Sequence, residues 1–552
     1  MKFEIQDVDA LGRIGKIEVN NKQMITPNLF PVIHPFDNVI TASGLKDLGA
    51  QCLFTNAYIM YKNKEYREEI LNKGIHDFLN YDGIIATDSG AFQQYMYNDN
   101  KIEISPEEIE NFQERIESDF PVILDLPVQL EDTFEVAESK VLLTIERAKE
   151  NISRRENPKC QWIGPIHGGK FPDLLKRSSI EMSKLDFGIY AIGGLVKAFL
   201  QYQFELTLKM LITVKKNIIP NKPLHMFGLG LPQFFSLAVA CGCDLMDSAA
   251  YILFAKENRY FTLSTGTKRL DELTEFPCHC PICTKYTPGE VKTFEPEIIV
   301  ELLAKHNLYL SFSELRTIRQ AIRDGNLWEL VETRIRNHPN LVNAYRTVKN
   351  NEDFFEIYEK AYKNHGRLYS SVESVNRPLF RRYFNKLGTN YRIPKEVKFL
   401  IILPELDVKG TYSSEIQKWL GIIDNSVFRE KIHIILASSY YGVIPNELME
   451  SFPLGQHEGS IEFKYQGHAH NALNNTKFFF EKNHDQYDKI AILIPNEYLN
   501  ELNELTEISK NNVIFIIQNY LTDKFKEKVF TFLTIESALG YFNDGLKDDD
   551  LK

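Results

Sequence analysis

Short, continuous runs of apolar residues alternate with longer amphipathic segments between residues 29 and 246. Each run is too short for a helix and shows no alternation of polar residues, which is typical of strands buried on both faces. The segments between them have helical length and helical spacing of apolar residues. The runs are Leu29–Ile33, Cys52–Asn56, Gly83–Thr87, Pro121–Leu124, Gln161–Ile166, Gly188–Ile192, Pro223–Phe227 and Asp244–Met246. Eight parallel strands separated by helices predict an α/β fold of the (β/α)8 or TIM-barrel type.

Polar residues and glycines follow six consecutive predicted strands. Asp88, Asp125 and Asp247 follow the third, fourth and eighth strands, His167 follows the fifth, and glycines follow the sixth and seventh. Taken singly, each has a structural explanation, since an aspartate can cap a helix and a glycine can form a turn. A lone histidine can equally be a satisfied core residue. Together they indicate a functional cluster, because barrel enzymes build their active sites at the carboxyl ends of the strands.

Three cysteines within six residues form a candidate metal site. Cys278, Cys280 and Cys283 have the spacing Cys-X-Cys-X-X-Cys, and thiols this dense typically ligate Zn²⁺ in a chain without signs of secretion. His306, at the end of a helical segment, is the best fourth ligand, because His279 is wedged between two of the cysteines. One structural Zn²⁺ per chain is the prediction, and buried, inert thiols are the alternative.

Composition and charge limit the class of protein. The 552 residues exceed what one hydrophobic core usually supports, and 43% hydrophobic and 25% charged residues are ordinary for a soluble globular protein. A net charge of −11 argues against a uniformly basic nucleic-acid binder, although local basic clusters remain possible. No apolar run is long enough to cross a membrane, and the first residues lack the pattern of a signal peptide. We therefore expect a cytoplasmic protein with no membrane contact.

The chain changes character twice after the predicted barrel. A helical stretch rich in arginine and aromatic residues either grips phosphates and bases or forms a linker packed on the barrel. Further apolar runs beyond it predict a small α/β domain with strands at Phe399–Leu403, Ile432–Leu436, Ile490–Ile494 and Val513–Ile517. The expected domains are 1–345 with the zinc site at about 270–345, 346–396 as a helical connection, and 397–552.

Several motifs together resemble one enzyme family. They are Asp-Ser-Gly-Ala-Phe-Gln at 88–93, Val-Ile-Leu-Asp-Leu-Pro at 122–127, Ile-Gly-Gly-Leu at 192–195, Phe-Gly-Leu-Gly at 227–230, Gly-Cys-Asp-Leu-Met-Asp-Ser-Ala-Ala-Tyr at 242–251 and Cys-His-Cys-Pro-Ile-Cys at 278–283. In this order they resemble the tRNA-guanine transglycosylases and, more closely, the archaeal branch that acts in archaeosine formation. The resemblance covers about residues 1 to 340 and continues more loosely to the end.

The resemblance implies a base exchange in tRNA with retention of configuration. A guanine, at position 15 of the D-loop in the archaeal branch, would be replaced by free 7-cyano-7-deazaguanine (preQ0). Retention requires two carboxyl groups in different roles. By resemblance, Asp247 attacks the ribose C1′ and holds a covalent RNA intermediate, and Asp88 is the general acid and base. Asp125 would accept hydrogen bonds from the guanine edge, which offers paired N–H donors.

The remaining base pocket is also implied by the resemblance. Its residues would be Ser89, the backbone near Gly194 and Leu195, and Phe92 and Phe227 as stacking partners for the flipped base. His167 stands where the family has glutamine. An imidazole can still donate a hydrogen bond to a purine carbonyl, but its protonation would make the contact depend on pH.

The expected partners are tRNA, the free 7-deazaguanine base and a second copy of the chain in a homodimer. Archaeal members commonly end in an RNA-binding PUA module that is not recognisable here, and a separate PUA-type RNA-binding chain is one candidate partner; the sequence does not decide whether such a chain supplies the module. The arginines expected to contact phosphates are Arg316, Arg319, Arg323, Arg334, Arg336, Arg377, Arg381 and Arg382.

Three other functions remain open from the sequence. An archaeosine synthase is disfavoured, because its chemistry is expected to need a cysteine in the C-terminal half and none follows Cys283. A queuine- or preQ1-type tRNA enzyme, or a DNA 7-deazaguanine transglycosylase, would have the same pocket. A non-catalytic tRNA-binding paralogue would have no need of both Asp88 and Asp247.

Overall fold

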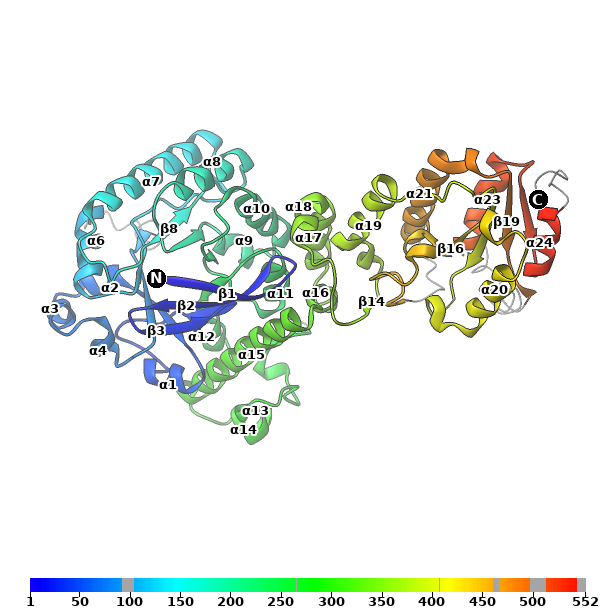
Figure 1. Cartoon of the computed structure of the whole chain (residues 1–552). Coiled ribbons are helices and arrows are strands. Elements are labelled where there is room, and N and C mark those ends of the chain that lie inside the picture. Colours follow the sequence, from blue (N-terminus) through cyan, green and yellow to red (C-terminus); the bar gives the residue numbers. More distant parts are fainter. Residues whose placement is uncertain (92–103, 265, 407, 460–465, 497–512, 544–552) are drawn as a thin grey trace. The chain divides into compact units, whose positions relative to one another are not determined.

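The computed structural model describes residues 1–91, 104–264, 266–406, 408–459, 466–496 and 513–543, with no side chains at 466–471. The chain divides into two compact units, Met1–Asn350 and Asn351–Lys552. Each unit has its own sheets and its own helices (Figure 1). No helix in the described part of the chain combines the length and apolar character that crossing a bilayer needs.

Parallel strands form the centre of the first unit. Their bounds are β4 (Asn28–Pro31), β5 (Cys52–Asn56), β6 (Ile84–Asp88), β7 (Phe120–Pro121), β8 (Ile163–Ile166), β9 (Ile189–Ile192), β10 (Leu224–Met226) and β11 (Leu245–Ser248). Each overlaps one of the eight apolar runs in the sequence. They form a five-stranded sheet in the order β4-β11-β10-β9-β8 and a three-stranded sheet in the order β5-β6-β7.

The two sheets are linked at both of their edges. A parallel bridge between Val32 and Phe54 connects the end of β4 to β5, and a second between Val122 and Ile163 connects the end of β7 to β8. Following the pairings from strand to strand therefore leads through all eight strands and back to the first. Every one of these pairings is parallel. The structure thus has the parallel α/β architecture that the alternating pattern predicted.

Helices connect successive strands and surround them (Figure 1). Their bounds are α1 (Ala42–Asp47), α2 (Ala57–Lys62), α3 (Lys64–Lys73), α4 (Ile75–Leu79), α6 (Pro106–Arg115), α7 (Phe134–Arg154), α8 (Pro172–Ser183), α9 (Val196–Leu200), α10 (Phe204–Asn217), α11 (Pro232–Ala240) and α12 (Ala250–Lys256). The strands are too short to fold alone, and burying their apolar side chains against these helices stabilises them.

An antiparallel sheet of β1 (Lys2–Asp9), β2 (Gly12–Val19) and β3 (Lys22–Ile25) precedes the parallel strands. Its apolar residues Ile17, Val19 and Met24 share one buried cluster with Phe30, Ile84, Phe120 and other strand residues of the centre. The peptide before Pro27 joins β3 to the start of β4. The sheet therefore packs against the amino-terminal side of the parallel strands, which leaves their carboxyl ends for a site.

The segment after α12 holds the cysteine motif. It comprises β12 (Arg259–Thr262), β13 (Gly266–Arg269), η1 (Leu270–Glu272), α13 (Pro281–Lys285), α14 (Pro288–Val291), α15 (Pro296–Asp324), α16 (Leu327–Ile335) and α17 (Pro339–Lys349). Proline at the start of α15 and Gly325 in the left-handed conformation after its end are typical helix boundaries. Helix α15 packs along α12, which follows the strand that carries Asp247.

The second unit contains a five-stranded sheet in the order β17-β16-β15-β19-β20, with β17 antiparallel to its neighbour. Its elements are α18 (Glu352–Tyr358), β14 (Arg367–Tyr369), η2 (Val372–Asn376), α19 (Pro378–Thr389), β15 (Phe399–Pro404), η3 (Gly410–Tyr412), α20 (Ser414–Asp424), η4 (Arg429–Lys431), β16 (Ile432–Ser438), β17 (Gly442–Pro445), η5 (Asn446–Leu448), β18 (His457–Gly459), α21 (Gln466–Asn483), η6 (His484–Gln486), β19 (Lys489–Leu493), α23 (Val513–Lys524), β20 (Val529–Phe532) and α24 (Ile535–Asn543). Apolar residues of α19 share one core with this sheet.

One predicted strand of this unit is wrong. Residues Val513–Ile517 form the first turns of α23, and the strand lies later, at β20. The β-branched composition favoured a strand, but Val513, Ile514, Ile517 and Leu521 are buried at helical spacing. Packing of that helical face outweighs the intrinsic preference of the residues.

Candidate active site and metal centre

A cavity of about 620 Å³ opens at the carboxyl ends of the parallel strands in the first unit. Asp88, Asp125 and Asp247 all line it, together with His167 and Phe227. These five residues come from the ends of five different strands or the turns that follow them. The structure therefore brings together the acids, the imidazole and one of the aromatic residues singled out in the sequence.

Asp88 is the last residue of β6 and has only neutral hydrogen-bond partners. Its Oδ2 accepts from Nδ2 of Asn56 at 3.1 Å, and its Oδ1 accepts from the backbone N–H of Gly90 at 3.2 Å. Burial, followed by the negative charges of Asp125 and Asp247, raises the pKa of Asp88 from its usual 3.8 to about 7. A carboxyl group with this pKa can both give and take a proton near neutral pH.

Asn56 holds Asp88 while it caps a helix. Its side-chain oxygen accepts from the N–H of Ile59 in the first turn of α2, which leaves its amide hydrogens to face Asp88. Strands β5 and β6 pair Asn56 directly with Asp88. The register of the sheet therefore sets the contact.

Asp125 and His167 form a buried pair. Nε2 of His167 donates to Oδ2 of Asp125 at 2.5 Å, and only 2% of the histidine is exposed. The imidazole lies against Gly193, where a Cβ atom would come within 2.3 Å of the ring. The strand-end glycine thus makes room for a histidine that orients Asp125, a role that the sequence pattern did not indicate.

Asp247 lies in β11 and is also held by an imidazole. Nε2 of His225 donates to its Oδ1 at 2.8 Å, and the backbone N–H of Gly228 donates to the same oxygen at 3.1 Å. Sequence analysis missed His225, because a single histidine inside an apolar run resembles an ordinary core residue. Two of the three acids in the cavity therefore have a histidine partner, and Asp88 has none among the residues described.

The other predicted pocket residues occupy varied positions. Gly194 lines the cavity with a φ of +77°, and a Cβ there would lie 2.4 Å from the carbonyl oxygen of Val128, so this turn requires glycine. Leu195 is fully buried, and the Ser89 hydroxyl is buried and donates to the carbonyl of Ile123. Phe92 lies outside the described residues, and the role of each in binding a base stays a prediction.

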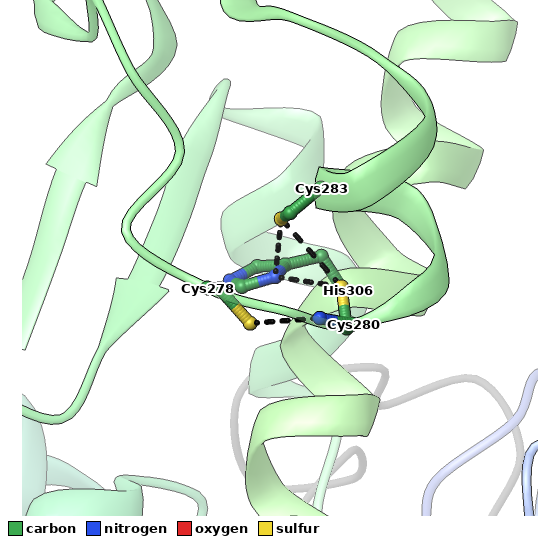
Figure 2. Close-up of side chains that lie close together, drawn as sticks. All are labelled: Cys278, Cys280, Cys283 and His306. Carbon is green, nitrogen blue, oxygen red and sulfur yellow. Dashed lines mark hydrogen bonds between the residues drawn. The ribbon is translucent and has the colours of Figure 1, made fainter.

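The cysteine motif and His306 converge on one point (Figure 2). The ligand atoms of Cys278, Cys280, Cys283 and His306 all lie within 4.8 Å of one another. Sγ of Cys283 is 3.4 Å from Nδ1 of His306, and Sγ of Cys280 is 3.5 Å from the same nitrogen. Ligands at the corners of a tetrahedral zinc site with bonds of about 2.3 Å are about 3.8 Å apart. The donor set and its spacing therefore fit a tetrahedral metal ion.

The surroundings of His306 orient its ring for this purpose. Nε2 donates to the carbonyl of Phe261 at 3.0 Å, so Nδ1 keeps its lone pair toward the three sulfur atoms. Tyr260 stacks on the imidazole at 3.6 Å between ring centroids, and its hydroxyl lies 3.3 Å from Sγ of Cys283. Residues of β12 thus fix the ligand carried by α15.

The structure separates the eight predicted phosphate-binding arginines into two groups. Arg334 binds the buried Glu314 through two hydrogen bonds, Arg381 pairs with Asp353, and Arg382 pairs with Glu356. Arg377 is 1% exposed and donates to a backbone carbonyl, and Arg336 also has a partner. Arg377 is too buried to contact a phosphate, so its nomination was wrong; the other four have partners within the chain, and their role in binding phosphates stays a prediction.

The remaining three arginines form what we call the arginine row, on one face of α15: Arg316, Arg319 and Arg323. Nη1 of Arg319 donates to the carbonyl of Pro27 at 2.7 Å, and none of the three has an ion pair with a described residue. Burial and the two neighbouring positive charges lower the pKa of Arg319 to about 10. The row is therefore positive charge without a counter-ion among the described residues, in a chain that is acidic overall.

Two carboxyl groups at the ends of parallel strands are typical of a glycosyltransferase that retains configuration. Asp88, with its pKa raised to about 7, is suited to proton transfer, and Asp247 accepts hydrogen bonds from His225 and Gly228. The chain belongs to the queuine tRNA-ribosyltransferase family, whose model matches residues 7–340.

Individual relatives extend the similarity beyond the family domain. A tRNA-guanine(15) transglycosylase of Methanocaldococcus jannaschii is 40% identical over 84% of this chain and 70% of its own length. Its namesake in Methanococcus maripaludis is 36% identical over 96% of this chain and 79% of its own length. The Pyrococcus furiosus protein of the same name is 42% identical over 69% of this chain and 64% of its own. The similarity therefore reaches into the second unit.

Proposed function

We propose that this chain exchanges guanine 15 of tRNA for free 7-cyano-7-deazaguanine, the first step of archaeosine formation. The observation that carries the proposal is the cavity in which Asp88, Asp125 and Asp247 meet, together with the raised pKa of Asp88, the group that would move the proton. The names of relatives that are 36–42% identical supply the polymer and the position.

Asp247 is the nucleophile in this proposal. One oxygen of its carboxylate attacks C1′ of the target nucleotide, the bond from C1′ to guanine breaks, and the RNA is held as an ester. Donors from His225 and Gly228 hold the carboxylate in place. Free base then attacks the same carbon from the vacated side, which releases Asp247 and restores the original configuration.

Asp88 moves the proton in both halves of the exchange. In its neutral form it gives a proton to the departing guanine, and as an anion it takes one from the incoming base. A pKa of about 7 keeps both forms accessible at neutral pH. Asp125, oriented by His167, accepts the N–H donors of the guanine edge, and Phe227 offers an aromatic face at the cavity.

The remaining expectations complete the proposal. The eight parallel strands, linked by two bridges, are interpreted as a closed (β/α)8 barrel. A structural Zn²⁺ is held by Cys278, Cys280, Cys283 and His306; four protein ligands leave no position for a reacting water. A homodimer stays a prediction, and light scattering with and without tRNA measures it. A separate RNA-binding chain also stays a prediction.

Labelled-guanine exchange into unmodified tRNA tests the function. We expect incorporation into tRNA with guanosine at position 15 and no incorporation into tRNA with adenosine at that position. PreQ0 should compete more strongly than its aminomethyl analogue or queuine. Competition in the reverse order would identify a queuine-type enzyme, and exchange into duplex DNA but not tRNA would identify the DNA enzyme. If no guanine is exchanged into tRNA and preQ0 does not compete, the proposal is refuted.

The roles of the two acids are tested by matched amide variants. With tRNA and an inert guanine analogue, wild-type protein should form an adduct that survives denaturing electrophoresis, and Asp247→Asn should lose both adduct and exchange. Asp88→Asn should bind tRNA normally while exchange falls by roughly two to four orders of magnitude. An adduct that persists in Asp247→Asn and is lost in Asp88→Asn would reverse the assignment.

A further inference from the structure

We propose that His225 is a positioning residue that ties down Oδ1 of Asp247 and so assigns the attack on the ribose to Oδ2. The inference rests on the proposed role of Asp247 as the nucleophile. It concerns a residue in the apolar run of the seventh strand that neither the sequence motifs nor the names of the relatives single out.

The strand register brings the imidazole to the carboxylate. His225 pairs with Leu245 across β10 and β11, and Asp247 lies two residues further along β11 on the same face. Nε2 of His225 donates to Oδ1 at 2.8 Å, and the N–H of Gly228 donates to that oxygen at 3.1 Å. Both recorded hydrogen bonds therefore fall on one oxygen of the carboxylate, although its second oxygen is equally capable of accepting.

Three aromatic side chains fix the orientation of the ring. Phe30 stacks on it at 5.6 Å between centroids with an angle of 17°, and Phe54 and Phe227 contact it edge to face at 6.1 and 4.9 Å. His225 is fully buried, and its Nδ1 has no hydrogen-bond partner among the residues described. Its only recorded polar contact is thus Asp247. The ring has one hydrogen bond and three aromatic neighbours. Turning it would break the hydrogen bond to Asp247 and disturb the packing against those neighbours.

This arrangement has a defined consequence for the exchange. When Oδ2 forms its bond to C1′ and the bond from C1′ to guanine breaks, Oδ1 becomes the carbonyl oxygen of the ester and keeps both donors. When free base attacks C1′, the electron pair returns to the carboxylate, and the same donors receive the restored negative charge. Donors that are in place beforehand require no reorganisation in either step. His225 therefore acts through Asp247 and touches neither the base nor the ribose.

The test compares two substitutions that differ in one hydrogen-bond donor. His225→Phe retains an aromatic ring between Phe30 and Phe227 but removes the donor, whereas His225→Gln places an amide N–H near the position of Nε2. We expect kcat for guanine exchange to fall roughly 10²- to 10³-fold in His225→Phe, as for loss of one preorganised donor. The KM for tRNA should stay within about twofold. His225→Gln should recover at least about tenfold of the loss.

The same proteins are followed by the rate of adduct formation with tRNA and an inert guanine analogue in a single turnover. A wild-type adduct that is absent in Asp247→Asn supports the nucleophilic role of Asp247 independently of His225, and guanine exchange by wild-type protein tests the proposed function separately. If that adduct forms and His225→Phe forms it at the wild-type rate, the positioning role is refuted. Equal losses in the Phe and Gln variants, or a loss seen in KM alone, would also refute it. His225→Leu is the second donor-free variant if His225→Phe does not fold.

Discussion

Replacing Asp88 by asparagine should stabilise the first unit more at alkaline than at acidic pH. The buried carboxyl group has a pKa of about 7 in the folded protein against its usual 3.8. In the unfolded chain it ionises from about pH 4 upward, while in the folded chain it stays neutral until about pH 7. Folding therefore holds a proton that the unfolded state releases, and stability falls as pH rises through this window. Asparagine cannot ionise, so the variant lacks this loss.

The size of the effect follows from the two pKa values. Linkage gives a cost of about 1.5 kcal/mol at pH 5 and about 4 kcal/mol at pH 8, hence a difference of at most about 2.5 kcal/mol. For a unit of 350 residues, an unfolding entropy of about 2.1 cal/mol/K per residue converts this difference to about 3–4 °C in Tm. The variant also presents an amide where both Asn56 and Gly90 donate, but that mismatch is independent of pH and cancels in the comparison.

Thermal unfolding of both proteins at pH 5, 6.5 and 8, without tRNA, measures the difference. Asp82→Asn is the matched control, because a hydrogen bond from Lys46 lowers the pKa of that exposed carboxyl group and its pH effect has the opposite sign. If the Tm difference between Asp88→Asn and wild type is the same at pH 5 and pH 8, Asp88 does not titrate near neutrality. Its assignment as the general acid would then lose its physical basis.

Two further predictions concern metal and RNA. Purified protein should contain about one zinc per chain by elemental analysis, and Cys280→Ser should lose it. Cys160→Ser, at a thiol distant from the motif in sequence, is the control and should keep its zinc. Full metal in Cys280→Ser would contradict the site. Charge reversal of the whole arginine row should weaken tRNA binding and reduce the slope of log affinity against log salt by about 2–3, since each phosphate contact contributes about 0.7–0.9. The guanidinium of Arg381 already pairs with Asp353, so Arg381→Glu should change the slope less. Equal slopes in both variants would place the RNA elsewhere.

The sequence predicted the strands of the first unit well because their burial leaves a simple pattern. Runs such as Cys52–Asn56 are buried throughout, since both faces of the strand are covered, and from the third run onward an aspartate or a glycine lies at or near each carboxyl end. The same rule failed at Val513–Ile517, where burial of one helical face also produces a dense apolar run. A short run contains too few residues to separate the two periods, so only the packing of the second unit decides between them.

The candidate site was predicted only as far as strand ends reveal it. Asp88, Asp125 and Asp247 follow apolar runs, and that position alone implied a common cavity. The pairing of His167 with Asp125 and of His225 with Asp247 depends on neighbouring strands, which the sequence does not order. The register of β10 and β11 would have been the signal for His225, because it places that residue on the same face as Asp247.

Helix α15 carries a metal ligand near its first third and the arginine row in its last third. Between His306 and Arg323 the helix advances about 25 Å at about 1.5 Å per residue. One inserted residue between them would turn everything beyond it by about 100° and carry the row away from the face that contacts Pro27. Insertions and deletions in related sequences should therefore lie before Pro296 or after Gly325. They should be rare between the metal ligand His306 and the arginine row.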